Sequence, residues 1–77
     1  MKSIQSPLPG IFYHKPSPED APYKEAGDHV SKGDTIGLIE VMKTFIKVNA
    51  EKDGVFISYV VENAAPVQAG DFLAEVS

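Results

Sequence analysis

The chain has 77 residues, 43% of them hydrophobic, and contains no cysteine, so neither disulfides nor thiolate metal sites can reinforce a single small domain. Seven lysines, no arginine and eleven acidic residues give a net charge of -4. This balance argues against a nucleic acid partner, because phosphate recognition favours a basic, arginine-rich surface. No apolar run approaches the roughly 20 residues of a membrane span, and no secretory signal is recognisable, so we expect a cytoplasmic protein without a membrane partner.

Short strand-forming runs separated by turn residues follow one another along the whole chain. The runs are rich in Ile, Val, Leu, Thr and Phe and are too short for typical helices. No segment has a convincing helical period. We therefore predict an all-β protein of about eight strands. The predicted strands span residues 2–6, 10–13, a very short segment at Val30, and residues 35–41, 44–48, 55–61, 66–67 and 72–76.

Residues 14–24 differ from the rest of the chain because they contain three prolines within seven residues. Proline fixes φ and removes a hydrogen-bond donor, so neither a central strand nor a helix interior fits this segment. We predict a rigid loop. The two histidines of the chain, His14 and His29, lack the spacing of metal ligands, and we interpret both as surface residues.

The predicted strands 35–41 and 44–48 are joined only by Met42 and Lys43. A hairpin this tight is normally turned by Asn-Gly, Asp-Gly or two glycines, because those residues accept positive φ angles. A place where local turn chemistry disagrees with the architecture is a candidate functional site. We expect the amine of Lys43 to project into water from the tip of this hairpin.

An internal repeat relates the two halves of the chain. Residues 30–36 align with 67–73 at a shift of 37 positions, and residues 9–12 align with 53–56 at a shift of 44. The first half therefore has seven extra residues, which fall in the proline-rich loop. The repeat predicts a pseudo-two-fold sandwich in which each half supplies strands to both sheets. The residues that we expect to fill its core are Phe12, Ile36, Leu38, Ile46, Val55, Phe56 and Val76.

The sequence offers no catalytic set. It has no cysteine, no serine in a Gly-x-Ser-x-Gly context, no His-x-x-His pair and no glycine-rich phosphate loop, and its carboxylates are spread along the chain. We therefore expect neither an enzyme acting alone nor a metal site. The feature that remains is the displayed amine of Lys43.

Three segments together carry a resemblance to a known family: Glu40-Val41-Met42-Lys43, the run 6–13, and Pro16-Ser17-Pro18. They resemble the biotinyl domain of biotin carboxyl carrier proteins, in particular the carrier subunit of bacterial-type acetyl-CoA carboxylase. The likeness covers nearly all of residues 1–77 as one carrier domain. It implies a flattened β-barrel, or sandwich hammerhead, of two four-stranded antiparallel sheets. It also implies that the proline-rich insertion, about residues 14–25, is a protruding thumb.

The resemblance implies that a biotin protein ligase attaches biotin covalently to Lys43. A biotin carboxylase would then load a carboxyl group, and a carboxyltransferase of acetyl-CoA carboxylase or a related acyl-CoA carboxylase would unload it, a step of fatty acid biosynthesis. The carrier itself would contribute no catalytic group. The residues next to the attachment point would be Glu40, Val41, Met42 and Thr44. The thumb residues expected either to touch the biotin ring or to pack on the barrel are Tyr13, Pro16, Ser17, Pro18 and Tyr23.

Two departures from the family motif leave alternatives open. The usual motif is Ala-Met-Lys-Met, whereas this chain has Val41 before Met42 and Thr44 after Lys43. A lipoyl carrier usually has Asp-Lys-Ala at the tip, which matches less well. An unmodified hammerhead that serves as an interaction module is a second alternative, and an unrelated small β-domain is a third.

Overall fold

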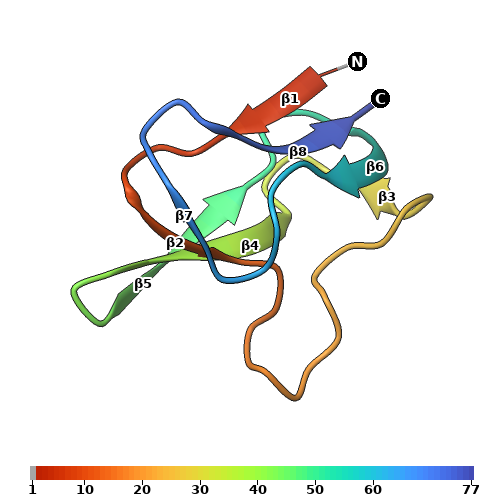
Figure 1. The fold of residues 1–77 in the computed structure, drawn as a ribbon. Helices are drawn as coiled ribbons and strands as arrows, with labels where there is room; N and C mark the ends of the chain where they lie inside the picture. Colours follow the sequence, from red (N-terminus) through yellow and green to blue (C-terminus); the bar gives the residue numbers. More distant parts are fainter. Residues whose placement is uncertain (1) are drawn as a thin grey trace.

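The computed structural model describes residues 2–77, which form eight β-strands. The strands are β1 (Lys2–Gln5), β2 (Gly10–Tyr13), β3 (His29–Val30), β4 (Thr35–Val41), β5 (Thr44–Asn49), β6 (Gly54–Tyr59), β7 (Ala65–Val67) and β8 (Phe72–Val76). No helix in this part of the chain is long and apolar enough to cross a membrane. In Figure 1 the β4–β5 hairpin projects to one side, the long loop between β2 and β3 hangs below, and β1 lies beside β8.

The strands form two four-stranded antiparallel sheets, with the orders β1-β8-β6-β3 and β5-β4-β2-β7. Exchanging each strand of the first half of the chain for its counterpart in the second half converts one order into the other. Each half thus supplies two strands to each sheet. The predicted pseudo-two-fold sandwich of two four-stranded sheets is confirmed.

The repeat extends to the turns that precede β4 and β8. Asp34 and Asp71 each accept a hydrogen bond at Oδ2 from the backbone nitrogen three residues earlier, at 2.9 and 2.8 Å. The preceding residues, Gly33 and Gly70, have φ angles of 93° and 89°, a region that residues with a Cβ rarely adopt. These two Gly-Asp turns, which occupy matching positions in the two halves of the chain, therefore have the same structure.

The core lies between the two sheets and is apolar, and among the described residues the one buried polar residue is Ser6. Five of the seven residues predicted for it are buried: Phe12, Ile36, Leu38, Phe56 and Val76. The core also contains residues that the sequence pattern did not single out, namely Val30, Ile39, Val48, Ala50, Val67, Leu73 and Ala74.

The prediction was wrong for two core residues. Val55 is 43% exposed because it lies opposite His29 on the outer side of β6, while the adjacent Phe56 points inward. Ile46 lies opposite Ile39, but it is only half-buried because β5 is an edge strand with a neighbour on one side only. In addition, β6 ends at Tyr59 rather than at residue 61, because the chain bends there toward the turn before β7.

Residues 14–28 form a loop without strand or helix, as predicted. His29 is exposed, but the interpretation of His14 as a surface residue was wrong. The ring of His14 stacks on Tyr59 with centroids 3.7 Å apart, and its Nε2 donates to the carbonyl of Val61 at 2.7 Å. The backbone nitrogen of His14 also donates to Asn63 Oδ1 at 2.7 Å. These contacts fix the root of the loop against the segment between β6 and β7.

Candidate functional site

The turn of the β4–β5 hairpin consists of Met42 and Lys43, because Val41 and Thr44 form the last pair of the ladder. Both turn residues have positive φ, 50° for Met42 and 66° for Lys43. Two positive φ angles are typical of the type I′ turn, whose twist suits a β-hairpin. For a residue with a side chain this backbone region costs roughly 1–2 kcal/mol. The chain therefore holds two unfavourable residues in place through the ladder on either side.

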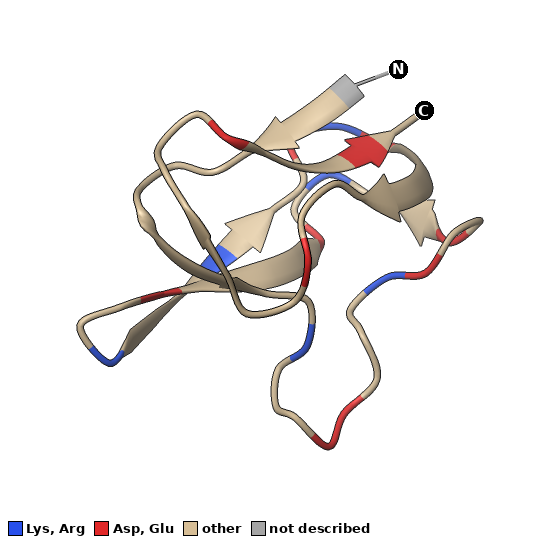
Figure 2. Ribbon diagram, in the orientation of Figure 1, with Lys and Arg blue, Asp and Glu red and all other residues tan. Residues whose placement is uncertain are grey.

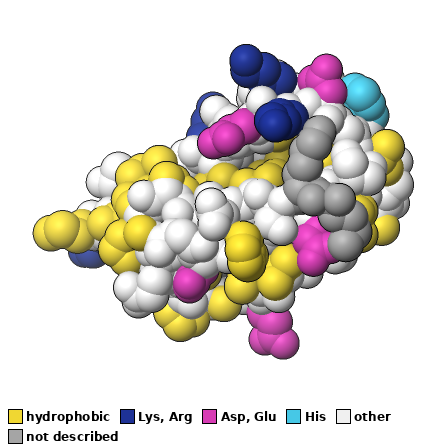
Figure 3. Space-filling view, turned by 90° about the horizontal axis from the view of Figure 1, so that it is seen from above, with side chains coloured by type: hydrophobic (Ala, Val, Ile, Leu, Met, Phe, Trp, Pro, Cys, Tyr) yellow, Lys and Arg dark blue, Asp and Glu magenta, His cyan; other side chains and the backbone are white. Residues whose placement is uncertain are grey.

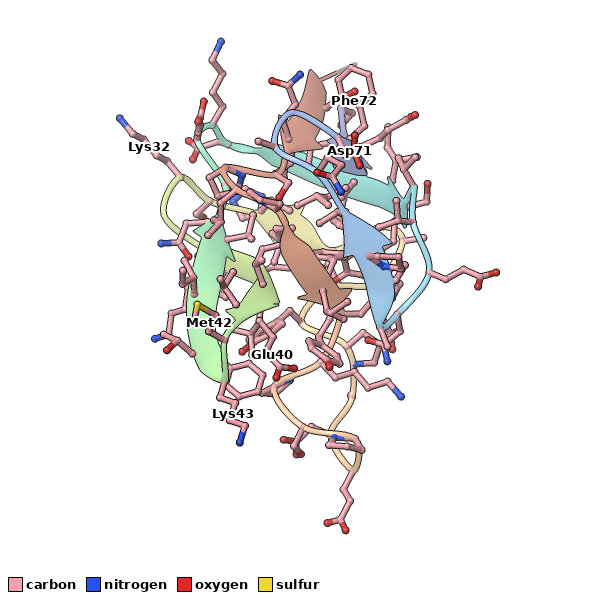
Figure 4. The ribbon with its side chains drawn as sticks, turned by 60° about the vertical axis from the view of Figure 1, so that its left-hand side comes forward. Lys32, Glu40, Met42, Lys43, Asp71 and Phe72 are labelled. Atoms are coloured by element: carbon pink, nitrogen blue, oxygen red, sulfur yellow. The ribbon has the colours of Figure 1, made fainter. Side chains whose placement is uncertain are left out.

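The tip of the hairpin is exposed to solvent. The side chain of Met42 is 93% exposed, and Lys43 is exposed beside it. Figure 3 shows the hydrophobic end of the hairpin standing clear of the rest of the molecule. In Figure 4 Lys43 extends toward the end of the molecule where the 14–28 loop lies, and Met42 points in a different direction. An amine in this position is accessible to a large partner.

Three strands are tied together just behind the tip. The hydroxyl of Tyr13 on β2 donates to Glu40 Oε1 on β4 at 2.9 Å. The ring of Phe45 on β5, directly opposite Glu40, lies 6.1 Å from the ring of Tyr13, centroid to centroid. The hydrogen bond to the Glu40 carboxylate, with smaller contributions from burial and from the charge of Glu40, raises the pKa of Tyr13. Tyr13 thus stays a neutral donor, and the base of the hairpin is connected to the sheet through side chains as well as through backbone.

An open groove runs between the hairpin and the 14–28 loop, and we call it the hairpin–loop groove. Its volume is about 390 Å³. It is lined by Tyr13, Phe45 and residues 15–18 and 63–64. Phe45 is 58% exposed, which is unusual for so large an apolar side chain. The groove therefore offers apolar surface close to Lys43, because Phe45 follows Lys43 by only two positions in the chain.

A second groove, of about 330 Å³, lies between the edge strands β1 and β5. Residues 47–52 line one side and Ser3, Ile4 and Gln5 the other. It begins four residues beyond Lys43 along β5 and includes no residue of the turn. Its position makes it a poorer candidate for a site that involves Lys43.

Charged side chains are dispersed rather than clustered. Figure 2 shows a basic residue at the hairpin turn and acidic residues on several separate loops and strands. Among residues 2–77 no group of three or more histidine, aspartate or glutamate side chains is arranged to hold a metal ion.

The structure brings most of the predicted site residues into two neighbouring places. Glu40 and residues 41–44 form the end of the hairpin, and Tyr13 and residues 16–18 line the groove beside it. Tyr23 does not line the groove; its backbone nitrogen donates to the carbonyl of His14 at 2.9 Å and closes the root of the loop.

Sequence reasoning missed the remaining groove residues. Phe45, Lys15 and residues 63–64 line the groove but were not singled out. For Phe45 a signal existed, because Phe45 sits in the strand next to the exposed turn. For the others there was none, since a lysine in a loop and an Asn-Ala turn are typical of any surface.

The strain in the turn gives a testable prediction. We expect Met42→Gly to increase the free energy of unfolding by about 0.5–1 kcal/mol, because glycine accepts positive φ and an almost fully exposed methionine contributes little packing. Chemical denaturation monitored by circular dichroism measures the change. Ala69→Gly is the matched control: Ala69 is also an exposed turn residue but has no positive φ, so its replacement should reduce stability. A loss of stability in Met42→Gly as large as in the control would contradict a strained turn.

Comparison with known proteins identifies the family to which this sequence is similar. Residues 2–76 match the model of a family described as "Biotin-requiring enzyme". The biotin carboxyl carrier protein of acetyl-CoA carboxylase from Pseudomonas aeruginosa is 40% identical over 65 residues, which are 84% of this chain and 42% of that protein. The biotin carboxyl carrier protein of acetyl-CoA carboxylase 2, chloroplastic, from Arabidopsis thaliana is 38% identical over 64 residues, 83% of this chain and 25% of that protein.

The fold also occurs within a solved carboxylase. The crystal structure of the Kluyveromyces lactis urea carboxylase superimposes with a TM-score of 0.79 and 32% sequence identity, over 99% of this chain and 6% of that one. The chain spans only 25% to 47% of the length of the first biotin carboxyl carrier proteins that it matches. It corresponds to one part of those proteins.

Proposed function

Because this chain belongs to the family of biotin and lipoyl attachment domains, we propose that it is a biotin carboxyl carrier domain and that Lys43 is the residue to which biotin is attached. The observation that carries the proposal is the two-residue turn that presents Lys43, next to Met42, at the exposed tip of the β4–β5 hairpin. Relatives named as carriers of acetyl-CoA carboxylase support biotin as the group.

Lys43 differs from the other six lysines of the chain in its backbone. Among residues 2–77 it is the only lysine with a positive φ and the only one in a two-residue turn between paired strands. Lys24, by contrast, is bound to Asp34 at 3.2 Å. A ligase that docks on the rigid hairpin finds one amine in a defined position, whereas the other described lysines lie on strands or in longer loops.

The role of the domain in the reaction is transport. In the proposed cycle, a ligase activates the carboxyl group of biotin and must remove a proton from Lys43, because only the free amine attacks to form the amide. A biotin carboxylase then adds a carboxyl group, and a carboxyltransferase passes it to an acceptor, for which the names of the relatives suggest acetyl-CoA. The tether keeps the carried group at a high effective concentration at two successive sites, while the bound biotin supplies the chemistry.

We assign the hairpin–loop groove as the place where the bicyclic ring of the attached group rests while the domain travels between enzymes. Phe45 and Tyr13 offer aromatic surface, and Pro16 and Pro18 offer rigid apolar surface, all close to the tether. Tyr23 stands apart from this groove, so we assign it to the root of the loop and not to ring contact.

The experiment that tests the proposal is the intact mass of the chain after co-expression with a biotin protein ligase and excess biotin. We expect a single biotinoyl increment, which peptide mapping locates on Lys43. A folded protein that gains no increment with this ligase, but gains a lipoyl increment with a lipoate ligase, would instead identify a lipoyl carrier. No increment with either enzyme would favour an unmodified interaction module.

A further inference from the structure

One residue with a charged side chain lines the hairpin–loop groove. This residue is Lys15, and the others that line the groove are uncharged: aromatic, proline, serine, asparagine and alanine residues. Within residues 2–77 the one ion pair between side chains is that of Lys24 and Asp34. Lys15 thus brings an unpaired cation to a groove that is otherwise neutral and largely apolar.

The backbone of Lys15 is held firmly. The preceding residue, His14, is bonded through its ring to Val61 and through its backbone nitrogen to Asn63, both at 2.7 Å. The following residue is Pro16, which restricts Lys15 to extended geometry. The side chain of Lys15 is half-buried, so part of its length lies against the protein.

The positive charge of Lys15 acts on the neighbouring side chain of His14. Burial lowers the pKa of His14, the hydrogen bond to the Val61 carbonyl acts in the opposite direction, and the positive charge of Lys15 lowers it further. Glu40 is the one acidic residue of the β4–β5 hairpin and therefore the one residue of the hairpin that could compete for this cation. Its carboxylate accepts the hydrogen bond from Tyr13, and Glu40 does not line the groove.

The groove is within reach of a group attached to Lys43. Phe45, which lines the groove, is the second residue of β5 and follows Lys43 by two positions in the chain. The side chain of Lys43 extends toward the end of the molecule where the loop that carries Lys15 lies (Figure 4). A ring carried on a long flexible tether therefore meets the groove without any rearrangement of the strands.

We infer that Lys15 makes the hairpin–loop groove selective for the anionic, carboxylated form of the tethered ring over the uncharged form. This inference rests on the proposed function. The uncharged ring has only apolar contacts and neutral hydrogen bonds to gain in the groove. The carboxylated ring adds a negative charge that forms an ion pair with the Lys15 ammonium group, next to low-dielectric surface that strengthens the pair.

The pairing has a chemical consequence, because the carboxylated ring is unstable in water. In its spontaneous decay the bond between the ring nitrogen and the carboxyl carbon breaks, the electron pair returns to nitrogen, nitrogen takes a proton from water, and CO₂ leaves. The remaining hydroxide combines with CO₂ to give bicarbonate. Negative charge leaves the carboxylate as that bond breaks, so a cation paired with the carboxylate stabilises the starting state more than the transition state. Lys15 therefore slows the loss of the carried group.

The test measures this decay on the purified carrier. The biotinylated protein is charged with ¹⁴C-bicarbonate and ATP by a biotin carboxylase, separated from that enzyme, and followed for first-order loss of label. We expect Lys15→Gln to lose label about two- to five-fold faster than the unchanged protein, the range of a partly exposed ion pair. Lys15→Arg should keep the slow rate, and 1 M salt should narrow the difference, because it shortens the Debye length to about 3 Å.

Lys47→Gln is the matched control, since Lys47 lies on β5 but lines the other groove, and its replacement changes the net charge equally. Its rate of loss should equal that of the unchanged protein. Equal rates in Lys15→Gln and the unchanged protein, or an equal acceleration in Lys47→Gln, would overturn the inference and leave the carrier function intact. A protein that gains no biotin or takes up no label would instead overturn the proposed function. Biotin is recorded by intact mass, and uptake of label by radioactivity, before any rate is measured.

Discussion

Lys43→Arg is expected to accept no biotin while keeping its stability. The guanidinium group retains the positive charge but stays protonated in proteins, so it offers no free amine to the activated biotin. Because Lys43 is exposed and arginine meets the same positive φ, the free energy of unfolding should change by no more than about 0.5 kcal/mol. Intact mass after co-expression with the ligase measures modification, and chemical denaturation measures stability.

The control for this experiment is Lys47→Arg, four residues along the same hairpin. Lys47 is exposed, as Lys43 is, but it lies within β5 and not in the turn. The control should be modified as fully as the unchanged protein. Biotin on the Lys43→Arg variant would show that another lysine is the acceptor, and loss of biotin in both variants would show that the ligase responds to the hairpin in general and not to the turn.

The fold was predictable where the signals are local. Each Gly-Asp turn and each proline acts through the backbone angles of its own residues, so the eight strands, the long loop and the repeat could be identified from the sequence. The inward faces were harder to predict, because several strands are apolar on both sides and alternation then gives no direction. Val55 and Phe56 are both hydrophobic, and only the packing of the two sheets decides that Phe56 is buried and Val55 is 43% exposed.

The candidate site, like the fold, was predictable only in its local part. The conformation of the hairpin turn is determined by residues adjacent in the sequence, so the unusual turn at Met42 and Lys43 could be identified from the sequence. The hairpin–loop groove depends on contacts between distant residues, such as the hydrogen bond from Tyr13 to Glu40, which joins positions 27 apart. His14 was misinterpreted for the same reason, since the aromatic ring that stacks on it belongs to Tyr59 at the end of β6, far from His14 in the sequence.

Gly37→Ala is expected to destabilise the protein by about 2–3 kcal/mol, because β4 has no room for a methyl group at this position. A Cβ on Gly37 would lie 2.5 Å from Cε1 and 2.6 Å from Cζ of Phe12, and 2.8 Å from the backbone oxygen of Tyr13. Phe12 is fully buried, with the rings of His14 and Tyr59 against it, so it has little space into which to move. For a domain of this size the loss corresponds to a fall in Tm of about 10–20 °C, which thermal unfolding measures.

A second variant separates the clash from a general weakness of glycine replacement in strands. In Gly37→Ala combined with Phe12→Leu, the smaller side chain vacates part of the overlapping space, so the combined loss should be smaller than the sum of the two single losses by at least about 1 kcal/mol. Simple additivity, or a Gly37→Ala protein as stable as the original, would contradict the clash. The result also bears on the hairpin, because an alanine that pushes on the Tyr13 backbone displaces the tyrosine that is hydrogen-bonded to Glu40. We therefore expect the biotin acceptance of Gly37→Ala to fall even at temperatures where the variant is folded, which links the packing of the core to the presentation of Lys43.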